Sequence, residues 1–93
     1  MRRDAKVDAT HPEIVRALRA AGWSVISLAP LGCGIPDLAA SKGLETWLLE
    51  VKNPAAPPSK RKPNAEQLAF AASWQGKYAV VESAEQALAL VSA

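Results

Sequence analysis

Residues 46–52 limit the possible folds more than any other part of the sequence, because they are apolar on both alternating faces and yet include two charges. A strand that is apolar on both faces is typical of the centre of a sheet whose two sides are covered. Glu50 and Lys52 lie two residues apart, so their side chains project from the same face of such a strand. Charged groups are costly to bury unless they are paired or bind something. The stretch therefore predicts a central strand that carries a charged site.

The size and composition of the chain indicate one folded domain over residues 1–93. Autonomous domains usually have roughly 50–200 residues, and the 49% hydrophobic content is enough for a core. Cys33 is the only cysteine, so no disulfide is expected within the chain and a reducing, cytoplasmic location is expected. No stretch approaches the roughly 18 apolar residues of a membrane span, so no membrane partner is expected. A net charge of +2 excludes proteins that coat nucleic acid through bulk charge.

The periodicity of the chain predicts the element order helix, strand, strand, strand, helix, strand, helix. Thr10-His11-Pro12-Glu13 has the form of a capping box at the start of the first helix, and Gly22 ends it. Asn64 and Ser83 are expected to cap the later helices. The expected helices cover residues 10–21, 64–74 and 83 to the C-terminus, and the expected strands cover 23–28, 35–40, 46–52 and 78–81. This order predicts an α/β fold with a mixed central sheet flanked by helices.

Three connecting segments have distinct expected properties. Residues 29–34 contain two glycines and a proline, so an irregular loop is expected there that brings its backbone close to a ligand or another chain. Residues 41–45 are expected to form a hairpin turn. Residues 53–63 contain four prolines and three consecutive cations, which predicts an exposed, basic, semi-rigid loop that is mobile as a whole. Residues 1–9 are expected to form a flexible arm.

Two carboxylates and an ammonium are expected to converge in the predicted hairpin. Pro36-Asp37 opens one strand, and Glu50-Val51-Lys52 ends the next, so an antiparallel pairing brings Asp37 alongside Glu50. Mg²⁺ prefers carboxylate and carbonyl oxygens, which makes Asp37, Glu50 and the backbone carbonyl of Val51 candidate metal ligands. Such an ion at a phosphodiester supports hydrolysis, with Lys52 orienting water or neutralising charge in the transition state.

The same residues resemble the signature of the PD-(D/E)XK nucleases. Pro36-Asp37 stands for its first half and Glu50-Val51-Lys52 for its second. The likeness extends over nearly the whole chain to the virus-type replication-repair (VRR-NUC) branch of that superfamily. The segments that carry this likeness are Gly34-Ile35-Pro36-Asp37-Leu38, Trp47-Leu48-Leu49-Glu50-Val51-Lys52, the basic proline loop, and Asn64-Ala65-Glu66-Gln67.

The resemblance implies a fold, a site and a substrate. The implied fold is the restriction-endonuclease-like αβββαβ core. In this branch a glutamine on the helix after the second motif and a glutamate on the first helix complete the site, which by position implies catalytic roles for Gln67 and Glu13 and a metal contact for Glu13. The implied cofactor is Mg²⁺, with Mn²⁺ as a substitute. Small stand-alone members are typical of bacteriophages, act as homodimers and cut branched DNA such as Holliday junctions or flaps.

Basic residues supply candidate DNA contacts at two places. Lys60-Arg61-Lys62 places three cations beside the expected metal site, where they suit a phosphate clamp. Arg2 and Arg3 suit a second contact from the N-terminal arm. An ordinary solvated loop is the competing interpretation of the first group.

Structural roles compete with the catalytic ones at several positions. Asp37 after a proline also suits the opening of a strand or a turn. Glu50 and Lys52 also suit an ion pair on a solvated edge. These interpretations require no ligand.

Glu13 and Gln67 share a second structural alternative. Each lies three residues after a capping residue, Thr10 or Asn64, so each also suits a capping box at the start of its helix. The sequence leaves open whether the side chains serve the caps, the site or both.

The function expected from these observations is a metal-dependent DNA endonuclease. Two other classes compete with it. One is a structure-specific DNA-binding protein that has the nuclease fold and does not cut, and the intact set of Asp37, Glu50 and Lys52 disfavours it. The other is a small α/β interaction module whose proline-rich loop is a ligand for a partner protein.

Overall fold

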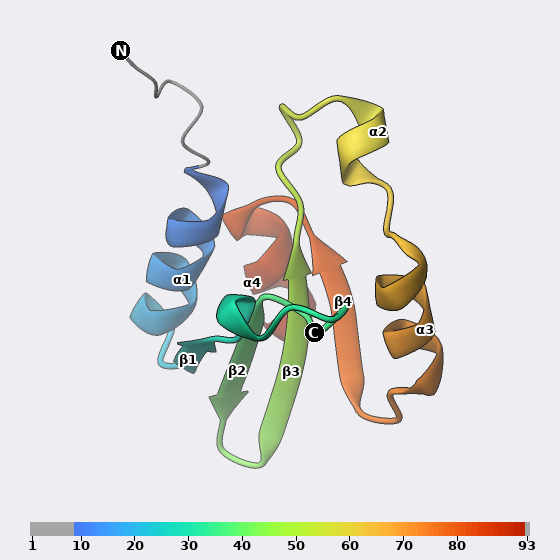
Figure 1. Ribbon diagram of the computed structural model, residues 1–93. Helices are drawn as coiled ribbons and strands as arrows, with labels where there is room; N and C mark the ends of the chain where they lie inside the picture. Colours follow the sequence, from blue (N-terminus) through green and yellow to red (C-terminus); the bar gives the residue numbers. More distant parts are fainter. Residues whose placement is uncertain (1–8, 93) are drawn as a thin grey trace.

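A mixed sheet of four strands forms the centre of the structure, a computed structural model that describes residues 9–92 (Figure 1). The predicted DNA contacts Arg2 and Arg3, and the expected arm up to residue 8, lie outside the described residues. The spatial order of the strands is β1–β2–β3–β4, with bounds Ser24–Ser27, Leu38–Lys42, Glu45–Val51 and Lys77–Val81. The first three strands are antiparallel to their neighbours, and β4 runs parallel to β3. The fold is therefore α/β with a mixed sheet, and β3 is an inner strand as predicted.

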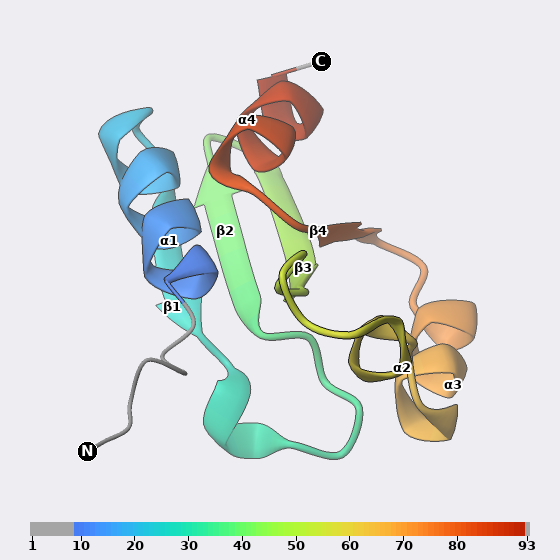
Figure 2. The same ribbon diagram turned by 90° about the horizontal axis from the view of Figure 1, so that it is seen from above.

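Helices lie on both faces of this sheet (Figure 2). The helices α1 (Thr10–Ala20) and α4 (Ala84–Ser92) contact each other on one face. On the other face lie α3 (Ala65–Ser73) and the single turn α2 (Pro58–Arg61). A short 3₁₀ turn, η2 (Ala29–Leu31), follows β1. No helix among residues 9–92 is long and apolar enough to cross a membrane.

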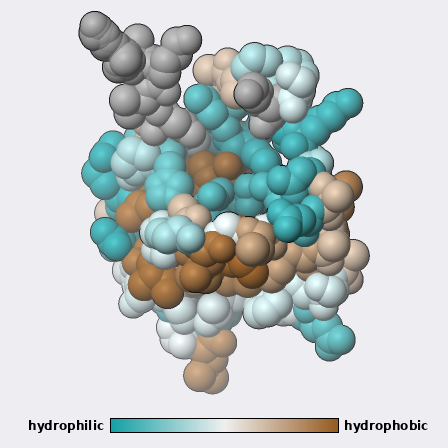
Figure 3. Space-filling model, in the orientation of Figure 1, coloured by the Kyte–Doolittle hydropathy of each residue, from teal (hydrophilic) through white to brown (hydrophobic). Residues whose placement is uncertain are grey.

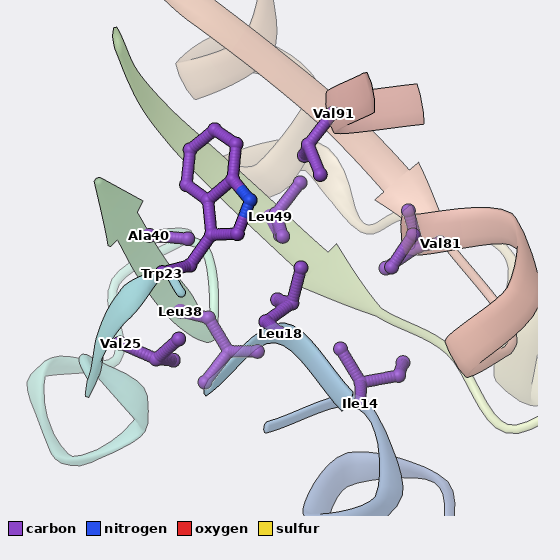
Figure 4. Packing of buried hydrophobic residues seen from close by; sticks show 10 residues of the cluster. Ile14, Leu18, Trp23, Val25, Leu38, Ala40, Leu49, Val81 and Val91 are labelled. Carbon is purple, nitrogen blue, oxygen red and sulfur yellow. The ribbon is translucent and has the colours of Figure 1, made fainter. Parts of the chain in front are cut away.

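The hydrophobic core fills the space between the sheet and the pair α1–α4 (Figure 4). Alternation along the strands directs every second side chain into this space. Burying a Val, Leu or Ile side chain contributes about 1.5–3 kcal/mol. The layer therefore stabilises the packing of α1 and α4 on the sheet. The buried residues of the cluster are Ile14, Leu18, Trp23, Val25, Leu38, Ala40, Leu49, Val81, Ala87 and Val91.

The same alternation sends the intervening residues to the opposite face. The β2–β3 hairpin closes with a two-residue turn whose first position is Gly43, at φ 63°, as hairpin turns of this length favour. Its register pairs Leu38 with Leu49. Continuing it by one step brings Asp37 opposite Glu50, on the face away from the core.

Three expectations about local structure are corrected. The helix α1 already includes Thr10, and its N-cap is Ala9, whose side chain makes no capping bond. The capping box predicted for Thr10 and Glu13 is therefore wrong, because helical hydrogen bonding begins one residue earlier, from the Glu13 amide to the Ala9 carbonyl at 3.1 Å. The strand expected from residue 35 begins at Leu38, since the preceding Pro36 has no N–H to pair.

The basic proline-rich segment, residues 53–63, is more structured than expected. The amide of Ala56 donates to the Asn53 carbonyl at 3.0 Å, which makes a turn, and Pro58 then begins α2. Proline is favoured at the first position of a helix because its missing N–H would have no partner there. A turn followed by a helical turn is not the extended polyproline conformation that a proline-rich ligand requires.

The glycine-rich loop before β2 packs against its own chain. Gly34 has φ +80°, and a Cβ built on it would lie 2.5 Å from the carbonyl oxygen of Glu66, in the first turn of α3. The close approach of backbone expected for residues 29–34 is therefore observed, and it is made to α3. Only glycine allows both this conformation and this contact.

Candidate active site

Charged side chains gather where β3 ends, on the sheet face opposite to α4. Asp37 lies directly before β2, and its Oδ2 accepts a hydrogen bond from the Val51 amide at 2.8 Å. The hairpin register determines this position, so Asp37 does more than open a strand. Its carboxylate bridges the two strands at the open end of the hairpin.

Glu50 is the one charged residue of the described part of the chain that is buried, with 5% of its surface exposed. Burial and then the negative charge of Asp37 raise the pKa of Glu50, and Lys52 offsets only part of this effect. Two neighbouring carboxylates, one of them desolvated, disfavour each other's charge. A bound cation would relieve this repulsion.

Gln67 links Glu50 to Lys52. Its Nε2 donates to Oε2 of Glu50 at 3.0 Å, and its Oε1 accepts from Nζ of Lys52 at 3.3 Å. Nζ of Lys52 also lies 3.4 Å from Oε2 of Glu50, and this lysine side chain is only 12% exposed. The interpretation of Glu50 and Lys52 as a pair on a solvated edge is therefore inconsistent with their burial.

Gln67 also completes the predicted capping box of α3. Its amide donates to Oδ1 of Asn64 at 2.8 Å, while its Oε1 accepts from the Asn64 amide at 2.9 Å. The two roles that the sequence left open for Gln67 are thus made by one side chain at the same time. The cap at the start of α3 therefore holds Gln67 in the position from which it bonds Glu50 and Lys52.

The main-chain carbonyl of Val51 lies at the end of the β2–β3 ladder. The register places Pro36 opposite Val51, and proline has no N–H to donate. In an antiparallel ladder the N–H and C=O of one residue point to the same neighbour. Because the Val51 amide points to Asp37, the carbonyl points to the same side, and the ladder offers it no donor. It remains available to a ligand.

Tyr78 lies beside the charged group, which consists of Asp37, Glu50 and Lys52. The sequence had indicated no role for Tyr78 in the site. It lies on β4, and together with Glu50 and Lys52 it lines a pocket of about 150 Å³ between α3 and the sheet. Burial and the charges of Glu50 and Asp37 raise the pKa of Tyr78. Its hydroxyl therefore stays protonated at neutral pH. The parallel pairing of β3 and β4 brings it here, and no local motif signals that pairing.

Glu13 is exposed on α1. Among residues 9–92 no three Asp, Glu, His or Cys residues form a group that could hold a metal ion. The structure describes Asp37 and Glu50 as a carboxylate pair, and the metal contact that the family resemblance implies for Glu13 stays a prediction.

One of the predicted basic residues lies at the pocket. Arg61, at the end of α2, lines it, and its Nη1 is 3.8 Å from Oε2 of Glu82. Lys62 follows and is exposed. The side chain of Lys60 lies outside the described residues. Figure 3 shows hydrophilic residues gathered at this end of the molecule, with a band of hydrophobic residues beside them.

A larger hollow, of about 350 Å³, shares no residue with the charged group. It lies between α1 and β1 and is lined by His11, Pro12, Val15, Arg16, Arg19, Val25 and Ser27. Arg19 already donates to the carbonyl of Val25 at 2.9 Å. We place the candidate site at the smaller pocket because the paired carboxylates and the partly buried Lys52 converge there.

No family model, curated protein or solved structure matches the chain. The class of this protein therefore has to be inferred from its α/β fold and from the charged group at the end of β3.

Proposed function

We propose that the protein is a metal-dependent DNA endonuclease of the PD-(D/E)XK type, related to the VRR-NUC branch. The observation that carries this proposal is the convergence of Asp37, Glu50 and Lys52 at the end of β3. The element order and the mixed sheet are consistent with the restriction-endonuclease-like αβββαβ core. A lysine whose side chain is only 12% exposed, beside two carboxylates, is unusual in a purely structural role, because each charge is costly to desolvate.

The oxygen atoms at this position fit a hard divalent cation. Asp37 and Glu50 would hold Mg²⁺, or Mn²⁺ in its place, with the Val51 carbonyl as a third protein ligand. The raised pKa of Glu50 supports this assignment. It reflects burial and then repulsion between two close carboxylates, and a bound cation would offset that repulsion. When bound, the ion would polarise the phosphoryl oxygen and activate a water molecule.

The remaining residues of the group would orient the reacting atoms. Lys52 is held by Gln67 and Glu50 with its ammonium 3.3 and 3.4 Å from them. From there its Nζ would position the attacking water or stabilise negative charge on the phosphate as it develops. Gln67 would act as a positioning residue, because it bonds the lysine and the carboxylate and neither donates nor takes a proton.

DNA as the substrate is supported by the cations next to the pocket. If a DNA backbone passes the carboxylates, Arg61, which lines the pocket, and the exposed Lys62 that follows it would supply phosphate contacts. Branched DNA, such as a Holliday junction or a flap, and a homodimer follow from the family resemblance. A dimer would also enlarge the small surface that 93 residues offer to a junction.

A cleavage assay tests the proposal. Linear duplex, flap and four-way-junction DNA of shared sequence are incubated with the protein, with and without Mg²⁺ or Mn²⁺. We expect metal-dependent cutting that Lys52→Ala lowers by about 10²–10³-fold, the usual effect of removing one transition-state contact. Lys77→Ala is the matched control, since that lysine pairs with Glu45 near the beginning of β3 and should cut normally.

The outcomes separate the competing classes. DNA binding without cutting under every metal condition would identify a non-catalytic DNA-binding protein. If the protein neither binds nor cuts DNA, the small α/β interaction module is the remaining class. Light scattering tests the dimer separately, and a mass near 9.8 kDa at micromolar concentration would exclude it.

A further inference from the structure

The pocket beside the charged group has the size of a single ring system. Its volume of about 150 Å³ is below the roughly 300–1,000 Å³ of pockets for drug-sized ligands. Glu50, Lys52 and Gln67 are among its lining residues. A group held in the pocket would therefore lie next to whatever reacts at Asp37 and Glu50.

Apart from Arg61, the rest of the pocket lining is apolar or aromatic. Leu68 and Ala71 from α3 face Tyr78 and Val80 from β4, and Leu68 and Val80 are still 56% and 45% exposed. Apolar side chains that stay exposed around a recess favour burial by a partner. The Tyr78 ring also contacts the Phe70 ring, with centroids 6.2 Å apart and planes tilted by 50°. An aromatic side chain that lines a pocket suits stacking by another flat ring.

Two cations line the pocket, Arg61 and Lys52. Nε of Arg61 is buried and has no hydrogen-bond partner within residues 9–92, while Nη1 of the same residue lies 3.8 Å from Glu82. Lys52 is paired with Glu50 at 3.4 Å. A ligand that matches both the apolar walls and the cations has a flat ring attached to an anion, which is the chemistry of a nucleotide.

We propose that this pocket receives one unpaired nucleobase of the DNA strand, adjacent to the phosphate that is cut. The inference rests on the proposed endonuclease function and narrows its substrate. A base inside a duplex cannot reach the pocket without leaving the stack, and this costs least where the base is already unpaired. The enzyme therefore selects strands with an unpaired nucleotide beside the cleavage position, as found at flaps and bulges.

Substrate analogues test this selection with the unmodified full-length protein. Three DNAs of one sequence are compared in Mg²⁺: a full duplex, the same duplex with a one-nucleotide bulge, and the bulge with an abasic residue. We expect the bulged DNA to be cut about tenfold faster than the duplex, and the abasic residue to remove this advantage, because the lost base stacking is of that size. Equal rates on the duplex and the bulge, or on the bulge and its abasic form, would overturn the proposal while the endonuclease assignment stands.

A pair of variants tests the pocket itself. Ala71→Phe fills the pocket without altering the charged residues, and Ala72→Phe puts the same side chain on the exposed side of α3. With 2-aminopurine as the bulged base and EDTA present, we expect the fluorescence to change on binding for the wild type and for Ala72→Phe, because the base moves from its neighbours in the strand onto Tyr78. Ala71→Phe should bind the bulged DNA about tenfold more weakly.

The metal-free measurement also separates the two hypotheses. If the wild type cuts no DNA but still shows the fluorescence change, the endonuclease function fails and base capture stands. If Ala71→Phe and Ala72→Phe bind alike, base capture fails, whatever the cutting rates. If Ala71→Phe does not fold, the abasic substrate alone decides.

Discussion

Gly34→Ala should disturb the candidate site from a distance, through the contact between the glycine-rich loop and α3. A Cβ at position 34 would lie 2.5 Å from the carbonyl oxygen and 2.6 Å from the carbonyl carbon of Glu66. These are backbone atoms of the first turn of α3, so no side chain can rotate out of the way. Either the loop or the start of the helix has to move, and Gln67 is the next residue along that helix.

The expected loss of stability has two parts. A left-handed backbone costs an L-residue about 1–2 kcal/mol, and forcing extra atoms into a packed contact costs about 1–3 kcal/mol. Gly34→Ala should therefore lower the free energy of unfolding by about 2–5 kcal/mol. Gly43→Ala is the matched control, because Gly43 has φ +63° but nothing within 4 Å of its Cβ position. Gly43→Ala should therefore lower the free energy of unfolding only by the backbone cost of about 1–2 kcal/mol.

Thermal and urea unfolding followed by circular dichroism measure both variants. In a domain of this size each kcal/mol lowers Tm by about 4–8 °C, so the two variants are easily distinguished. Cleavage rates are then compared at a temperature where both are folded. We expect Gly34→Ala to cut more slowly, because Gln67 is displaced from Glu50, and Gly43→Ala to cut normally. Equal destabilisation of the two variants would refute the steric argument.

Three further predictions concern the charged group and its surroundings. Glu50→Gln should raise the stability at pH 7 in EDTA. The folded-state pKa of Glu50 lies above its unfolded value, so the wild type loses stability as pH rises from about 4.5 through the raised pKa. Denaturation at pH 4 and pH 7 should show the gain only at the higher pH, and an equal gain at both would contradict it. Asn64→Ala should cost about 1 kcal/mol in urea unfolding by removing the cap of α3, and no loss would mean that the cap contributes nothing. Lys62→Ala should reduce the slope of log K against log salt for DNA by about 1, and an unchanged slope would place Lys62 away from the phosphates.

The sequence predicts most of the sheet because its signals are local. The apolar alternation of residues 46–52 and the short turn before them define the hairpin, and the hairpin register alone brings Asp37 to Glu50. The cap at Asn64 likewise lies within four residues of Gln67. A pattern that spans a few residues is enough for these features.

The features that were missed depend on contacts between distant segments. Tyr78 reaches the pocket only because β4 pairs in parallel with β3 after a crossover, and nothing around Tyr78 marks that pairing. The start of α1 was misplaced by one residue because Thr10 looks like a better cap than Ala9, yet the helix extends past it. The helical turn at Pro58 was missed because the density of prolines favours an extended loop.

Gln67 hydrogen-bonds both the start of α3 and the charged group, and this restricts which residue position 67 tolerates. Glutamate would keep the cap of α3 but add a third negative charge against Glu50. Asparagine would keep the amide on a side chain that is one methylene shorter, so it would not span from the helix start to the carboxylate. Alanine would leave both the Asn64 amide and the Glu50 carboxylate without their partner. Glutamine satisfies the helix and the charged group together, so position 67 should tolerate substitution less than the exposed positions of α3.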